Sequence, residues 1–141
     1  MIREGDPIPE PLEGGSIMVT SIDLQSKWFE VLIDFLKESS EYTEKQIIES
    51  KIPDCMAMRC GLVGVLQHFG LCDSRICRIS GMTSGQVYRA KQRILTFERE
   101  GNISFKRLME ILKKLVQKKI KEQEVEWEEM MQMFDKELGL I

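Results

Sequence analysis

The chain has 141 residues, of which 43% are hydrophobic and 30% are charged. Such a length suits one domain with a buried core, and such a composition is typical of a globular protein and excludes a disordered one. No apolar run approaches the roughly 18 residues that cross a bilayer, and no basic-then-apolar signal pattern opens the chain. We therefore expect a cytoplasmic protein with no membrane partner.

The formal net charge of −3 conceals three segments of alternating sign. Residues 1–70 carry 6 basic and 12 acidic residues, residues 71–121 carry 13 and 4, and residues 122–141 carry 1 and 7. The three net charges are therefore −6, +9 and −6. The acidic total argues against nucleic acid as a partner, whereas the strongly basic middle segment argues for it.

The chain opens with a segment that has little to bury. Residues 1–20 hold prolines, glycines and acids, which predicts a flexible acidic tail. Apolar residues then recur at spacings of three and four and predict a helix over residues 23–38. Thr43 and Gln46 form a capping-box pair, which predicts the start of a short helix. Alternation of period two never persists, so we predict an all-α helical bundle with its folded domain at residues 21–101.

The most hydrophobic segment is a helix predicted over residues 54–69. Pro53 suits its first turn, and Gly70 is placed to end it. Because this helix is apolar on nearly all sides, we expect it in the centre of the core. His68, the only histidine, lies at its end. Without a second histidine or a paired nucleophile, His68 is expected to be a capping or partly exposed residue and not a catalyst.

Four cysteines, Cys55, Cys60, Cys72 and Cys77, follow a C-x4-C…C-x4-C pattern. A zinc site is one interpretation, but structural zinc sites usually use tighter pairs that reach one tetrahedral ion. These cysteines are interleaved with apolar residues at helical spacing, so we predict reduced packing residues with no metal and no cofactor. No nucleophile–base pair or phosphate loop accompanies them, and we expect no enzyme activity.

The basic segment contains the stretch "ICRISGMTSGQVYRAKQRI", residues 76–94. Asp73 is placed to cap a helix over residues 74–80, and Gly81 to end it in a left-handed turn. Thr83 pairs with Gln86 in a second capping box that starts the next helix at once. That helix turns Val87, Ala90, Ile94 and Phe97 inward. Two helices joined through so short a turn predict a helix-turn-helix unit at residues 73–97.

This stretch resembles the G-[IM]-[ST]-x-x-x-V core of LuxR-type regulators and of sigma factor region 4. It is also similar to the C-terminal DNA-binding domain of the DnaA initiator and to Trp repressor, in which an apolar helix precedes the motif, as residues 54–69 do here. The resemblance covers residues 73–97, or 54–97 with that helix, and implies binding of duplex DNA. The acidic–histidine pair of the DnaA family is absent, because Thr83, Ser84 and Gly85 stand in its place, so an origin-binding role is not implied.

The charged and polar residues of this stretch indicate which side chains would contact DNA. Arginine recognises guanine and glutamine recognises adenine in the major groove, and a glycine lets a helix end approach closely. We therefore predict base contacts from the outward residues Gly85, Tyr88, Arg89 and Gln92. Phosphate contacts are predicted from Arg75, Arg78, Lys91, Arg93 and Arg99. The alternative is the solvated face of a helical hairpin, but such faces mix signs and residues 74–97 contain no acid.

Residues 102–141 predict one long helix, capped by Asn102 or Ser104 and running without glycine or proline to about Leu138. Its distal residues Trp127, Met131, Phe134 and Leu138 form a stripe of heptad-like spacing. A helix of this length, about 50 Å, exceeds what the domain covers, so we predict that the stripe forms a homodimer. Packing on helix 23–38 of the same chain is the alternative.

The sequence thus predicts a dimeric transcription regulator that binds duplex DNA and that has a protein of the transcription machinery as a further partner. The competing hypothesis is a helical adaptor that binds another protein through residues 104–141 and does not bind DNA.

Overall fold

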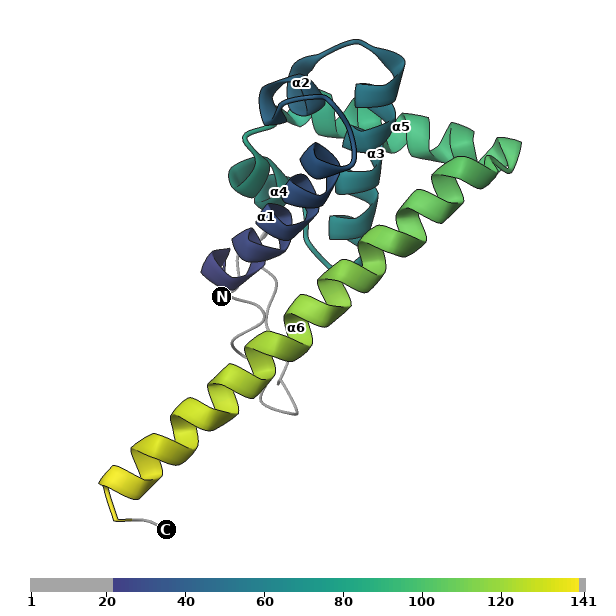
Figure 1. The fold of residues 1–141 in the computed structure, drawn as a ribbon. Coiled ribbons are helices and arrows are strands. Elements are labelled where there is room, and N and C mark those ends of the chain that lie inside the picture. The colour runs from purple at the N-terminus through teal and green to yellow at the C-terminus, as the bar shows by residue number, and fades with distance from the viewer. Residues whose placement is uncertain (1–21, 140–141) are drawn as a thin grey trace.

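The computed structural model describes residues 22–139, which fold into six α-helices without a β-strand in that range (Figure 1). The all-α prediction is confirmed. The helices are α1 (Ile22–Glu38), α2 (Glu44–Glu49), α3 (Pro53–His68), α4 (Asp73–Ser80), α5 (Ser84–Glu100) and α6 (Ile103–Glu137). The predicted acidic tail at residues 1–20 lies outside the described residues.

Helix α3 lies at the centre of the bundle and contacts each of the other five helices. Every residue from Cys60 to Leu66 is buried, as expected for a helix that is apolar on nearly all sides. Two glycines in this run allow close packing. A Cβ at Gly61 would lie 3.0 Å from a methyl of Leu112, and one at Gly64 would lie 3.0 Å from the methyl of Met109. These glycines therefore let α6 approach the backbone of α3.

Side chains cap several helix starts where the sequence predicted them. Thr43 and Thr83 each accept a hydrogen bond from a backbone N–H three residues on and form complete capping boxes with Gln46 and Gln86. Asn102 caps α6 through the backbone N–H of Phe105, at 2.8 Å. The prediction for Asp73 was wrong. The N-cap of α4 is Cys72, which makes no side-chain cap hydrogen bond, and Asp73 is the first residue of the helix.

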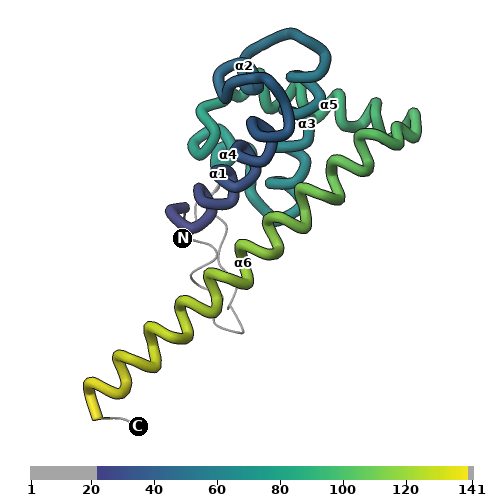
Figure 2. Tube along the Cα trace, viewed as in Figure 1, coloured from purple at the N-terminus to yellow at the C-terminus, as the bar shows by residue number. Residues whose placement is uncertain are grey.

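Helix α6 runs along one side of the bundle and continues past it (Figures 1 and 2). Phe105, Leu112 and Val116 are buried against the core. The last anchoring point is Gln123, which is only 2% exposed. Its carbonyl accepts a hydrogen bond from the indole N–H of Trp28 at 3.0 Å, and its amide donates to the backbone carbonyl of Leu24 at 3.1 Å. Helix α6 is thus joined to α1 at Gln123 by a buried polar contact.

Candidate nucleic-acid interface

The connection between α4 and α5 is short, and its buried polar groups are hydrogen-bonded. Gly81 has φ +82°, and its N–H donates to the carbonyl of Cys77 at 2.9 Å, so the predicted left-handed end of α4 is confirmed. Ser80 occupies a buried position where an apolar residue is more usual. Its hydroxyl donates to the carbonyl of Ile76 at 2.6 Å and accepts the N–H of Met82 at 3.1 Å. Both polar functions are bonded, which removes the cost of burying this side chain.

Helix α5 is oriented by its inner face. Val87 and Ala90 are buried, and Ile94 and Phe97 are partly buried against the core, as predicted. Phe97 also stacks on Phe105 of α6, with ring centroids 4.6 Å apart. Because four residues at spacings of three and four pack inward, the opposite side of α5 faces solvent.

The four residues predicted to contact bases lie at or beside this outer face. Tyr88, Arg89 and Gln92 are exposed. Gly85 is half-buried because the guanidinium of Arg89 folds over it. A Cβ at Gly85 would lie 3.3 Å from Nη1 of Arg89, and its three nearest side-chain neighbours are all atoms of that guanidinium. A flexible side chain therefore covers Gly85 at the start of α5.

The five residues predicted to contact phosphates fall into two groups. Arg78, Arg93 and Arg99 are exposed. Arg75 is half-buried and donates a hydrogen bond to the side-chain carbonyl of Gln25 on α1. Lys91 is also half-buried and forms an ion pair with Asp73 at 3.1 Å. The structure therefore places two of the five residues in contacts between helices.

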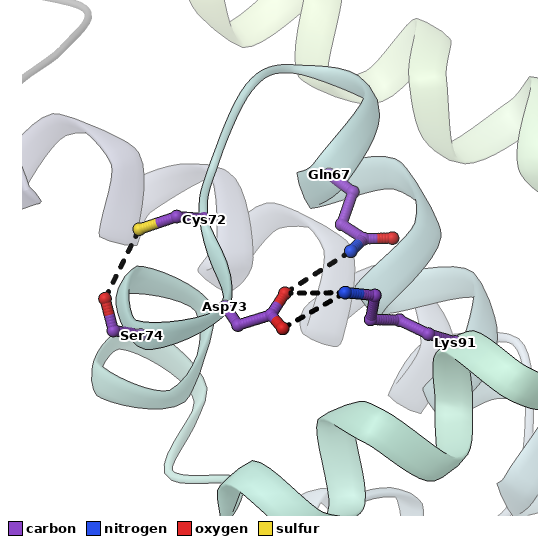
Figure 3. Close-up of polar contacts among 5 residues, drawn as sticks. All are labelled: Gln67, Cys72, Asp73, Ser74 and Lys91. Atoms are coloured by element: carbon purple, nitrogen blue, oxygen red, sulfur yellow. Dashed lines mark hydrogen bonds and ion pairs between the residues drawn. The ribbon is translucent and has the colours of Figure 1, made fainter. Parts of the chain in front are cut away.

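Asp73 joins three helices (Figure 3). Its carboxylate accepts from the ammonium of Lys91 at 3.1 and 3.3 Å and from the side-chain amide of Gln67 at 3.4 Å. Beside it, the thiol of Cys72 and the hydroxyl of Ser74 lie 3.3 Å apart. Because Asp73 and Lys91 are 52% and 38% exposed, their pair contributes less than about 1 kcal/mol to folding. The pair links the start of α4 to α5 at a partly exposed position.

One basic residue of this surface is not part of the sequence motif. Arg59 of α3 donates to the backbone carbonyls of Ile47, at 3.1 Å, and Ser50, and so holds the end of α2. It lines a hollow of about 50 Å³ together with Arg89 and Arg93 of α5. Burial lowers the pKa of Arg59, as do these two neighbouring arginines to a smaller extent, but a guanidinium stays charged at neutral pH.

This hollow concentrates positive charge. Its other lining residues are uncharged at neutral pH: Met56, Cys60, Gln86 and Ala90. Burial raises the pKa of the Cys60 thiol to about 11, so Cys60 supplies no thiolate. Within residues 22–139, Arg89 and Arg93 form no ion pair with a carboxylate. Three arginines thus line a hollow of the size of one small anion.

The remaining candidate residues give no second site. Cys55 and Cys60 are buried, whereas Cys72 is exposed, so the prediction that all four cysteines are packing residues was wrong for Cys72. The thiols form no disulfide, and no three metal-ligating side chains converge in residues 22–139. His68 is exposed at the end of α3, as expected. No helix in the same range is long and apolar enough to cross a membrane.

No family model, curated protein or solved structure that we compared with this chain matches it.

Proposed function

We propose that the protein binds duplex DNA, with α4 and α5 acting as a helix-turn-helix and α5 entering the major groove. The observation that carries the proposal is the outer face of α5. It presents exposed Arg89, Gln92 and Arg93 on a helix that is fixed at its start by a complete capping box. Arginine and glutamine are the side chains suited to guanine and adenine, and a rigid helix holds them in register.

The intramolecular contacts of the basic residues divide them into those that face DNA and those that join helices. Arg89 and Gln92 are the candidates for base contacts, and Tyr88 and Gly85 lie beside them. Arg59 joins the phosphate-contacting group of Arg78, Arg93 and Arg99, because its two backbone bonds fix it beside α5. Arg75 and Lys91 act mainly between helices: Arg75 holds α4 against α1, and Lys91 holds α5 against α4.

A regulator of transcription is the role that fits such a DNA-binding protein. The DNA proposal requires one α5 in one groove, so it stands apart from the question of whether the protein is a dimer. The competing hypothesis, an adaptor that does not bind DNA, makes the opposite prediction for a titration with DNA. The two are therefore separated by one measurement.

The test is a fluorescence-anisotropy titration of the full chain with a duplex selected from a random pool and with an unselected duplex. We expect binding that weakens as salt rises, with a logarithmic slope of about −0.9 per phosphate contact. Arg89→Ala should weaken binding to the selected duplex by roughly 1–3 kcal/mol. It should therefore narrow the gap in affinity between the selected and the unselected duplex. Lys114→Ala, an exposed lysine on α6, should leave that gap unchanged.

Two further variants test the phosphate contacts. Arg59→Gln should lower the affinity for both duplexes equally. It should also reduce the slope of the logarithm of affinity against the logarithm of salt concentration by about one unit. Asp73→Asn removes the negative charge beside α5 and releases Lys91. It should therefore raise the affinity for both duplexes and make the salt dependence of binding steeper. Glu100→Gln makes the same charge change at the end of α5 and is the control for a nonspecific charge effect. If the wild-type chain shows no salt-dependent binding of either duplex, the adaptor hypothesis replaces this one.

A further inference from the structure

The distal part of α6, residues 124–137, carries an apolar stripe that no described residue buries. Trp127 is 41% exposed, Met131 39%, Phe134 54% and Leu138, which follows the helix, 57%. These residues recur at spacings of four, three and four, so they lie on one face. The alternative of packing on α1 is therefore wrong for this stripe.

The stripe continues the face by which α6 is anchored to the bundle. Leu112, Val116 and Gln123 are buried on that face, and Trp127 follows Gln123 by four residues. Gln123 bonds to the backbone of Leu24, close to the first described residue of α1. Figure 2 shows α6 running on past the N-terminal end of α1. The same apolar face thus extends for about 20 Å past the anchoring contact, at 1.5 Å per residue.

Acidic residues surround the stripe. Residues 122–137 contain seven acids and one base, Lys136. The acids are Glu122, Glu124, Glu126, Glu128, Glu129, Asp135 and Glu137. Within the described residues, only Glu122 of this group forms an ion pair, at 3.7 Å with Lys119. The segment therefore combines an uncovered apolar face with an almost uncompensated negative charge.

This charge disfavours a second copy of the chain as the occupant. Two such stripes packed together, in either direction, would bring the acids of one helix beside the acids of the other. Like charges that face each other across an interface oppose association. The same acids attract a positively charged partner and orient it along the helix.

The apolar side chains indicate the form of that partner. Met130 and Met131 are flexible and polarisable, and methionine-rich surfaces adapt to the side chains of a docked helix. Trp127 and Phe134 supply the larger aromatic anchors that concentrate binding energy. An amphipathic helix would set its own apolar residues, at spacings of three and four, along this stripe.

We propose that distal α6 binds a basic amphipathic helix of another protein, which pairs its apolar face with Trp127, Met131 and Phe134 and its lysines or arginines with the surrounding acids. This interface is separate from the DNA-binding surface and does not depend on it.

The test uses the full chain and two synthetic helical peptides, one built of leucine and lysine and one of leucine and glutamate. Trp127 is exposed and Trp28 is 2% exposed, so a blue shift of tryptophan emission reports on the stripe. We expect micromolar binding of the lysine peptide, weakening with salt, and no binding of the glutamate peptide. Trp127→Phe should remove the emission change without abolishing binding measured by calorimetry.

Paired variants separate docking from simple charge attraction. The double variant Met131→Gln, Phe134→Gln keeps every charge, and it should lower the affinity for the lysine peptide at least tenfold. Val125→Gln with Met133→Gln changes two exposed apolar residues off this face and should alter affinity less than twofold. All four positions are exposed, so thermal melting of the bundle should be unchanged in both variants. Equal loss in the two variants would overturn the proposal.

Two results with the protein alone would also overturn it. A dimer in sedimentation at tens of micromolar and neutral pH, with Trp127 shielded from acrylamide, would make a second copy the occupant. A monomer in which Trp127 is equally shielded would mean that the chain covers its own stripe.

Discussion

The two parts of α6 have the same sequence pattern and different surroundings. From Ile103 to Gln123 the apolar face is buried against α1 and α3, whereas from Glu124 to Leu138 every apolar side chain is exposed. The helix continues through both parts without a glycine or a proline. Apolar periodicity therefore shows which face of a helix is to be covered, but it does not show what covers it. Charge provides that second kind of information, because basic residues predominate in the first part and acids in the second.

The largest expected difference between the parts is in folding stability. Leu112 is fully buried and Phe134 is 54% exposed. Leu112→Ala should lower the free energy of unfolding by about 2–5 kcal/mol, because it leaves a cavity between α6 and α3. Phe134→Ala should change it by less than about 0.5 kcal/mol. Urea denaturation followed by circular dichroism measures both, and similar losses would show that the distal stripe is packed.

The boundary between the parts is set by Gln123. Gln123→Leu keeps the side-chain volume but leaves the indole N–H of Trp28 without its acceptor and removes the amide that donates to the carbonyl of Leu24. We expect a loss of about 1–3 kcal/mol in the free energy of unfolding. Gln132→Leu, on the exposed distal part, is the control and should have almost no effect. A neutral Gln123→Leu would mean that this contact does not fix α6.

Two glycines with left-handed backbones extend the comparison to helix ends. Gly81 has φ +82° in the turn between α4 and α5 and Gly139 has φ +77° after α6, and a Cβ would meet nothing within 4 Å at either position. Gly81→Val should therefore cost about 1–2 kcal/mol from backbone strain alone. Gly81→Asn should cost less, since asparagine tolerates this conformation. Gly139→Val should leave the melting temperature unchanged, because an exposed helix end can rearrange freely. An unchanged melting temperature for Gly81→Val would contradict the turn.

The smallest effect is expected from removing residues 125–141 altogether. The bundle should keep its free energy of unfolding within about 0.5 kcal/mol, because the removed side chains bury little surface. The loss of acids should at the same time strengthen DNA binding. A large drop in stability would place the distal part within the cooperative fold.

Much of the fold could be predicted from local patterns. Thr43 with Gln46 and Thr83 with Gln86 marked two helix starts, because capping depends on residues three apart. Gly81 marked the end of α4 for a similarly local reason. Asp73 was misassigned because its carboxylate has a partner, Lys91, that lies eighteen residues away and becomes a neighbour only after folding.

The candidate site could be predicted only where it lies on one helix. Arg89 and Gln92 share the outer face of α5, which follows from helical periodicity alone. Arg59 carried no such signal, because it reaches the same surface from α3. Arg75 and Lys91 looked equivalent to the other basic residues in sequence, yet α1 and α4 supply them with intramolecular partners.

By itself the sequence determined the helices, their inward faces and the concentration of basic residues between positions 71 and 121. These properties follow from side-chain spacing, capping and composition, each of which acts within a few residues. Only the tertiary structure decided that three arginines from two helices line one hollow, and that the core covers α6 as far as Gln123 and no further. Both facts depend on which surfaces meet when the helices pack, and that is a property of the whole chain.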